Sequence, residues 1–125
     1  MFTEESASLG IDIAKSFMQL VNDIEPKWQK AYLRYSYRDF VGEVKGSYVH
    51  KAGVSLIGSL AHKDFFHPIL TQAKKLLESF NMPQGVFLLI VNSNKEYEFK
   101  FENKNMSRWR ISKMDGGAGI PEGEE

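Results

Sequence analysis

Cysteine is absent from this chain, and histidine occurs only three times. Without cysteine the protein has no disulfide framework, no thiolate nucleophile and no thiolate ligand for a metal ion. No stretch reaches the roughly eighteen consecutive apolar residues of a membrane-spanning helix, so we expect no membrane partner. The lack of cysteine also suits a reducing compartment, and we expect a cytoplasmic location. These absences favour a protein that binds another molecule over an enzyme.

Net charge is also absent, because 16 basic residues balance 16 acidic ones. A dedicated nucleic-acid-binding domain usually carries a basic excess that neutralises phosphates, so we do not expect nucleic acid to be the main partner. The N-terminal residues MFTEESASLG are acidic and lack a continuous apolar run. Neither a secretory signal nor a transit peptide is therefore expected.

The chain does contain enough apolar material for one core. Its 125 residues include 42% hydrophobic and 13% aromatic side chains, which can pack an interior without disulfides or a structural metal. This length is typical of a single domain, which we assign to residues 1–114. Residues 115–125, DGGAGIPEGEE, are rich in glycine and glutamate. We predict that they form a flexible acidic tail.

Two helices are predicted from apolar side chains that recur every three or four residues. In residues 4–24 one stripe holds Leu9, Ile13, Phe17, Leu20 and Ile24. Pro26 ends this helix, because proline cannot continue the hydrogen-bond ladder. The second helix is predicted for residues 68–80, with Pro68 in its first turn, where the missing N–H would have no partner anyway.

Strands are predicted where apolar and polar residues alternate. Residues 30–38 and 43–48 alternate around a turn at residues 39–42, which indicates an antiparallel hairpin. A shorter strand is predicted for residues 54–57. Residues 85–93 are apolar at both parities, which is typical of a central strand covered on both faces, and residues 96–102 alternate again. The prediction is an α+β domain of order α-β-β-(β)-α-β-β, with two main helices packed on an antiparallel sheet of about five strands.

The histidines are the main candidates for catalysis or metal binding. His62, Asp64 and His67 are close in sequence, and the fold could bring His50 near them. Imidazole and carboxylate groups must converge on one point to do this chemistry, and their spacing does not ensure it. There is also no Gly-x-Ser-x-Gly motif for a serine nucleophile. We predict no catalytic residue, no metal site and no cofactor, while a role for the histidine group stays open as a minor enzyme alternative.

A basic and aromatic group is predicted on the first hairpin. Tyr32, Arg34 and Arg38 should project from the non-core face of the first strand, and Lys45 from the second. Arginine and aromatic residues are enriched where proteins bind partners. The same side chains could stack on bases and contact phosphates, so a small nucleic-acid-binding or adaptor domain is the alternative. A plain solvated sheet face is the third interpretation.

Two separated parts of the chain resemble YezG-like bacterial immunity proteins, the antitoxins of polymorphic and contact-dependent toxin systems. The first helix followed by IEPKWQKAYLRYSY, and the later EYEFKFENKNMSRWRISKM, carry the likeness through Pro26, Trp28, Phe99, Phe101 and the pair Arg108 and Trp109. The chain departs from the pattern in its short span between the second and last strands and in the stretch HKDFFHPIL. The resemblance implies a cytosolic protein that binds a cognate toxin domain and blocks its active site or an essential surface, without cofactor or turnover.

A nuclease toxin would have a basic substrate groove, which acidic side chains could occupy. Glu96, Glu98 and Glu102 alternate along one predicted strand, and with the acidic tail they are the candidates for this contact. Reversing the three strand charges should then weaken binding. Trp28 and Trp109 are predicted to pack against the edge of the core. Whether the free protein is a monomer or a homodimer stays open.

Overall fold

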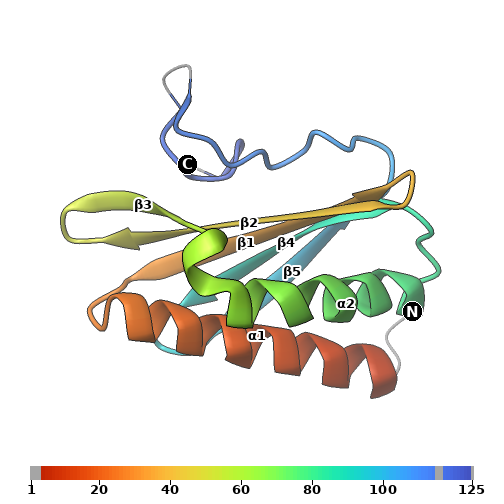
Figure 1. The fold of residues 1–125 in the computed structure, drawn as a ribbon, viewed down its shortest axis with the longest axis horizontal. Coiled ribbons are helices and arrows are strands. Elements are labelled where there is room, and N and C mark those ends of the chain that lie inside the picture. Colours follow the sequence, from red (N-terminus) through yellow and green to blue (C-terminus); the bar gives the residue numbers. More distant parts are fainter. Residues whose placement is uncertain (1–3, 115–116, 125) are drawn as a thin grey trace.

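The computed structural model describes residues 4–114 and 117–124 (Figure 1). In chain order the elements are α1 (Glu4–Ile24), β1 (Lys30–Arg38), β2 (Val41–His50), β3 (Gly53–Ile57), the short 3-10 helix η1 (Leu60–His62), α2 (Lys63–Ser79), β4 (Gly85–Asn92) and β5 (Tyr97–Glu102). The predicted α+β class and the order α-β-β-β-α-β-β are confirmed. No helix in the described part of the chain is long and apolar enough to cross a membrane.

The five strands form one sheet in the order β3-β2-β1-β4-β5, with every neighbouring pair antiparallel. Strand β4 is buried from Gly85 to Val91, because apolar side chains at both parities need cover on both faces of the sheet. The central strands β1 and β4 therefore lie between two apolar layers, one on each face of the sheet.

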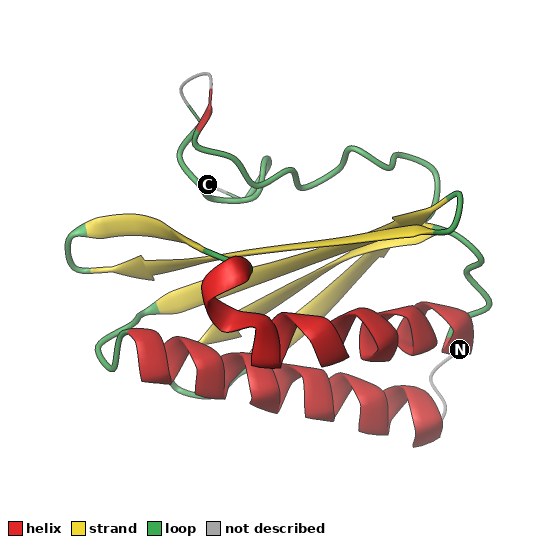
Figure 2. Ribbon diagram, in the orientation of Figure 1, coloured by secondary structure: helices red, strands yellow, loops and turns green. Residues whose placement is uncertain are grey.

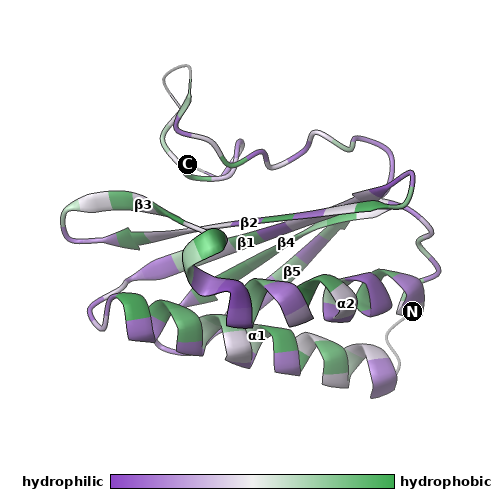
Figure 3. Cartoon of the chain, in the orientation of Figure 1, coloured by the Kyte–Doolittle hydropathy of each residue, from purple (hydrophilic) through white to green (hydrophobic). Residues whose placement is uncertain are grey.

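Helices α1 and α2 run antiparallel across one face of the sheet (Figures 1 and 2). Both alternate hydrophobic and hydrophilic residues along their length (Figure 3), as expected of helices with one buried side. Phe17 of α1 and Ile69 of α2 are almost fully buried against this face, where Leu33 and Phe87 project from the sheet. The start of α1 is also joined to the end of α2, because Ser6 Oγ donates a hydrogen bond to Ser79 Oγ at 2.7 Å.

Helix α2 begins at Lys63, so the predicted start at residue 68 is wrong. Pro68 lies inside the helix, where it provides no N–H for the carbonyl of Asp64. Burial of two aromatic rings accounts for the earlier start. Phe66 is 5% exposed, and the Phe65 ring centroid lies 5.9 Å from that of Phe17 on α1. These tertiary contacts stabilise the first helical turns of α2, which the spacing of apolar residues in the sequence does not predict.

The other face of the sheet is covered by residues 103–114 and 117–124, which we call the C-terminal segment (Figures 1 and 2). Trp109 and Ile111 are buried in one cluster with Leu88 of β4. Trp28 is 7% exposed and Trp109 3% exposed, which confirms the predicted packing of both indoles.

The described part of the predicted flexible tail, residues 117–124, is in contact with the rest of the domain. The N–H of Gly119 donates to the carbonyl of Ser112, and that of Glu122 to the carbonyl of Arg110, both at 3.0 Å. Lys100 Nζ on β5 donates to the carboxylate of Glu124 at 2.9 Å. Residues 115, 116 and 125 of the predicted tail lie outside the described residues. The composition of the tail predicts no local structure, but β4 needs a cover that this segment supplies.

Candidate functional site

The three predicted partner-binding glutamates do not form one free acidic face. Glu96 lies in the turn before β5, where its Oε1 accepts a hydrogen bond from Asn94 Nδ2 at 2.9 Å. Glu98 and Glu102 lie on β5, on the face that α1 and α2 do not cover. Within residues 4–114 and 117–124, the Glu98 side chain forms no hydrogen bond or ion pair, so of the three glutamates it is the one whose carboxylate has no partner among these residues.

Glu102 instead holds the start of the C-terminal segment. Its carboxylate accepts hydrogen bonds from Arg108 Nη1 at 2.8 Å and from the backbone N–H groups of Lys104 and Asn105 at 3.0 and 3.2 Å. The Arg108 hydrogen bond, followed by the two backbone donors, lowers the pKa of Glu102 to about 2. A carboxylate with these partners stabilises the chain reversal after β5 and is occupied within the protein.

Two residues of the predicted basic and aromatic group lie under the C-terminal segment. Tyr32 is 4% exposed and belongs to the buried cluster around Trp109. Arg34 Nε donates to the carbonyl of Arg108 at 2.8 Å, and its Nη2 donates to the carbonyl of Met106 at 2.7 Å. Burial lowers the pKa of Arg34, and the nearby Arg110 lowers it further. The predicted placement of Tyr32 and Arg34 on the non-core face is correct, but the C-terminal segment buries Tyr32 and half-buries Arg34. Neither side chain is therefore part of an open sheet platform for stacking bases.

Arg38 and Lys45, the other two members of that group, are exposed. Arg38 ends β1, and its Nε lies 3.4 Å from Asp39 Oδ2. Lys45 lies opposite Arg34 in the β1–β2 register, and both line a small hollow of about 130 Å³ with Glu43 and Arg110. The predicted group is therefore divided between the covered centre of the sheet and its rim.

The histidines lie in different environments. His50 Nε2 and Ser55 Oγ are 2.8 Å apart across the β2–β3 pair. His62 lines the cleft between the helices, whereas His67 lines a groove between α2 and β2. No group of three potential metal ligands forms among the described residues. The structure therefore does not bring the four polar residues of the histidine group to one point.

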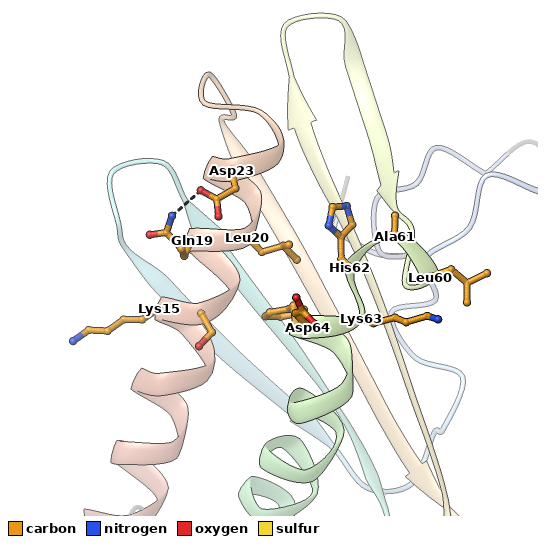
Figure 4. A pocket seen from close by; sticks show the side chains of 11 residues that line it. Lys15, Gln19, Leu20, Asp23, Leu60, Ala61, His62, Lys63 and Asp64 are labelled. Carbon is orange, nitrogen blue, oxygen red and sulfur yellow. Dashed lines mark hydrogen bonds between the residues drawn. The ribbon is translucent and has the colours of Figure 1, made fainter.

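The cleft between the helices is open and has a volume of about 770 Å³ (Figure 4). The end of α1 forms one wall and residues 60–65 form the other. Gln19 Nε2 donates to Asp23 Oδ1 at 2.8 Å on the α1 wall. Lys15 and Lys63 extend away from each other on opposite sides (Figure 4). The two walls together carry charged side chains of both signs, and these side chains do not point toward one common position in the cleft. The cleft therefore lacks the geometry of a charged ligand site or an acid–base pair.

A second groove follows an unpaired part of the sheet edge. Strand β3 pairs only with Gly46–His50 of β2, and the chain then leaves the edge after Ile57 to enter η1 and α2 (Figure 1). Residues 41–45 of β2, which we call the open β2 edge, are paired with β1 on one side only. The groove beside them has a volume of about 660 Å³. Val44, Phe66, Pro68 and Leu70 form its apolar part, and Ser59, Lys63, Asp64 and His67 form its polar part. We call it the edge groove.

The open β2 edge begins at an unusual hairpin turn. Asp39 and Phe40, the two residues of the turn, have φ angles of 52° and 64°. Both angles lie in the left-handed region, where two-residue hairpin turns favour asparagine and glycine. Phe40 is 94% exposed and Val41 57% exposed. A large apolar ring thus projects into solvent from backbone that ordinary side chains avoid.

Sequence reasoning located this turn at residues 39–42 but did not select Phe40. The available signal was an aromatic residue where a tight hairpin favours glycine.

Comparison with models of known protein families and with curated proteins finds no match to this chain. The function is therefore inferred from the residues and the geometry described above.

Proposed function

We propose that this protein binds another protein tightly and that, as the resemblance to immunity proteins implies, the bound partner is a bacterial toxin domain that it neutralises. The observation that carries the proposal is Phe40 at the tip of the β1–β2 hairpin, 94% exposed with a φ of 64°. A left-handed backbone costs a residue with a side chain about 1–2 kcal/mol, and an exposed ring gains no burial in return. Strain of this kind is typical of functional positions.

The surroundings of Phe40 resemble a small protein-binding surface. Val41 continues the apolar surface, while Arg38 and Asp39 carry opposite charges beside it, with side chains 62% and 83% exposed. Interface hot spots combine a central aromatic or apolar anchor with a polar rim. Charges of both signs at the rim speed encounter and favour one orientation of the partner.

The proposed mechanism is steric. The hairpin tip inserts Phe40 into a cavity of the toxin and obstructs its active site or a surface that its activity requires. Such blocking needs residence time but no chemistry, and a buried aromatic anchor lengthens residence by lowering the dissociation rate. The acidic contact suggested for Glu96, Glu98 and Glu102 is less favoured, because Glu102 is occupied by Arg108.

The test is a pull-down of the tagged protein against the product of the adjacent upstream reading frame, followed by co-expression to measure rescue from toxicity. Phe40→Gly removes the anchor and relieves the strained φ, so we expect this variant to be at least as stable as wild type, and its urea unfolding curve separates a loss of binding from a loss of fold. Met114→Ser is the matched control, because Met114 is 78% exposed and lies in the C-terminal segment, away from the hairpin tip.

We expect wild type and Met114→Ser to bind and rescue, and Phe40→Gly to bind roughly thirtyfold more weakly, the effect of losing a hot spot of about 2 kcal/mol. Absence of both binding and rescue by wild type would reject the proposal for this partner. Equal binding by Phe40→Gly would reject the hairpin tip as the contact.

A further inference from the structure

We infer that the open β2 edge binds an extended segment of the partner as an additional antiparallel strand, in line with β3. This inference rests on the proposed function, since it describes how the partner protein is held. It is carried by the hydrogen-bonding pattern of β2 together with the position of the edge groove.

The register determines which backbone groups face the open edge. Arg38 and Val41 are paired across the two-residue turn, so they exchange hydrogen bonds with each other. Hydrogen-bonded and non-hydrogen-bonded pairs alternate along an antiparallel ladder, and the N–H and C=O groups of Gly42 and Val44 therefore point away from β1. The same alternation points the N–H and C=O groups of Gly46 toward β3, where Gly46 pairs with Ile57.

Gly42 and Val44 thus continue the row of groups that β3 already uses. The turn and loop hydrogen bonds formed by the described residues include none to either residue. The two sets of groups are separated by two strand residues, or roughly 7 Å. Donors and acceptors at this spacing along a straight edge match an extended backbone, as in other cases of strand addition.

The edge groove supplies side-chain contacts on the helix side of such a strand. Gly42 and Val44 share the sheet face of Tyr35, which α2 covers, and both line the groove together with Pro68 and Leu70. Every second side chain of an added strand would point into this groove, because strand side chains alternate between the two faces. The occupant is therefore an extended segment with apolar residues at alternate positions.

Gly42 lines the end of the edge groove near the hairpin, and its lack of a side chain leaves space there. A Cβ at this position would lie 2.9 Å from the Tyr35 hydroxyl, which is closer than real Cβ atoms approach.

Phe40 lies at the hairpin end of the same edge, directly before Val41. A partner strand that pairs with residues 42–44 would therefore also meet the exposed ring, so the edge and the hairpin tip form one continuous surface.

The opposite edge of the sheet is less suited to strand addition. Strand β5 presents Glu98, Lys100 and Glu102 along one face, and charged side chains on an edge strand disfavour pairing with another chain. Lys100 is also joined to Glu124 of the C-terminal segment. The open β2 edge also carries charges, Glu43 and Lys45, on the face away from the helices, so what distinguishes it from β5 is the edge groove beside Gly42 and Val44.

The test uses random linear dodecapeptides displayed on phage and selected against the full chain, with each selected sequence then synthesised. Val44→Pro removes one edge N–H, and proline is tolerated on an edge strand where the N–H faces outward. Val44→Ala is the matched control, because it shortens the same side chain and keeps the N–H. Peptides N-methylated at successive positions provide a second measurement that uses only the wild-type protein.

We expect the selected peptides to bind wild type and Val44→Ala with similar affinity, and Val44→Pro about tenfold more weakly. N-methylation should abolish binding at alternate positions and leave it unchanged at the positions between them. Equal binding to Val44→Pro, tolerance of N-methylation at every position, or failure to select any peptide would overturn the inference. Dimers of wild type that Val44→Pro dissociates would also overturn it, by assigning the edge to a second copy of the chain.

The toxin-rescue experiment separates this inference from the proposed function. If wild type rescues and Val44→Pro rescues equally well, the inference fails and the proposed function stands. If wild type does not rescue but the peptides bind with the expected alternation, the proposed function fails for that toxin and the strand-binding edge stands.

Discussion

Replacing Arg34 with methionine should loosen the C-terminal segment from the sheet. Arg34 donates two hydrogen bonds to this segment, at 2.8 Å to the carbonyl of Arg108 and at 2.7 Å to that of Met106. A hydrogen bond from a charged group contributes about 1.5–3 kcal/mol to stability, and the partial exposure of Arg34 favours the lower value. Methionine retains most of the apolar stem. We therefore expect the free energy of unfolding to fall by about 2–3 kcal/mol.

Equilibrium urea unfolding, followed by tryptophan fluorescence, measures this change. Arg38→Met is the matched control, because Arg38 lies on the same strand and face but has a side chain 62% exposed and an ion pair of 3.4 Å to the exposed Asp39. Exposed ion pairs of this kind contribute at most about 1 kcal/mol, so this variant should stay close to wild type. Equal losses in the two variants would refute the view that Arg34 fastens the C-terminal segment.

Two further changes test the local chemistry. The lowered pKa of Glu102, about 2 against an ordinary 4.5, means that folding favours its carboxylate form, so its contribution is present above pH 4.5 and is lost as the pH falls toward 2. Urea unfolding across this range should therefore show wild type more stable than Glu102→Gln near neutral pH, with the difference shrinking on acidification; a difference independent of pH would contradict this. Phe40→Gly should raise the free energy of unfolding by about 1 kcal/mol, because glycine adopts positive φ without a steric penalty, and a decrease in the same assay would show that the ring packs in the free protein.

Local patterns predicted most of the fold. The bounds of α1 agree with the predicted residues 4–24, because its apolar stripe is regular and Pro26 follows it. The alternation in residues 30–38 and 43–48 predicted the hairpin, and residues 85–93 predicted a strand covered on both faces. The start of α2 was missed because it depends on the burial of Phe65 and Phe66 against other elements. Local spacing does not contain this contact.

The candidate site was less accessible to sequence reasoning. Alternation correctly placed Tyr32 and Arg34 on the face opposite the helices, but it does not reveal whether another segment lies over that face. The open β2 edge could not be predicted from local alternation either. It exists because β3 ends at Ile57 while β2 extends to Val41, and only the pairing of separate strands reveals the unequal lengths.

The sequence by itself determined the local elements, the α+β class and the side of each strand that faces the helices, because these follow from periodicity and turn chemistry among near neighbours. Tertiary structure alone decided that the C-terminal segment covers Tyr32 and Arg34, and that Phe40 and the open β2 edge stay uncovered. Burial and edge pairing depend on contacts between residues far apart in the chain. Their free energies are set by the whole packing arrangement, which no local pattern records.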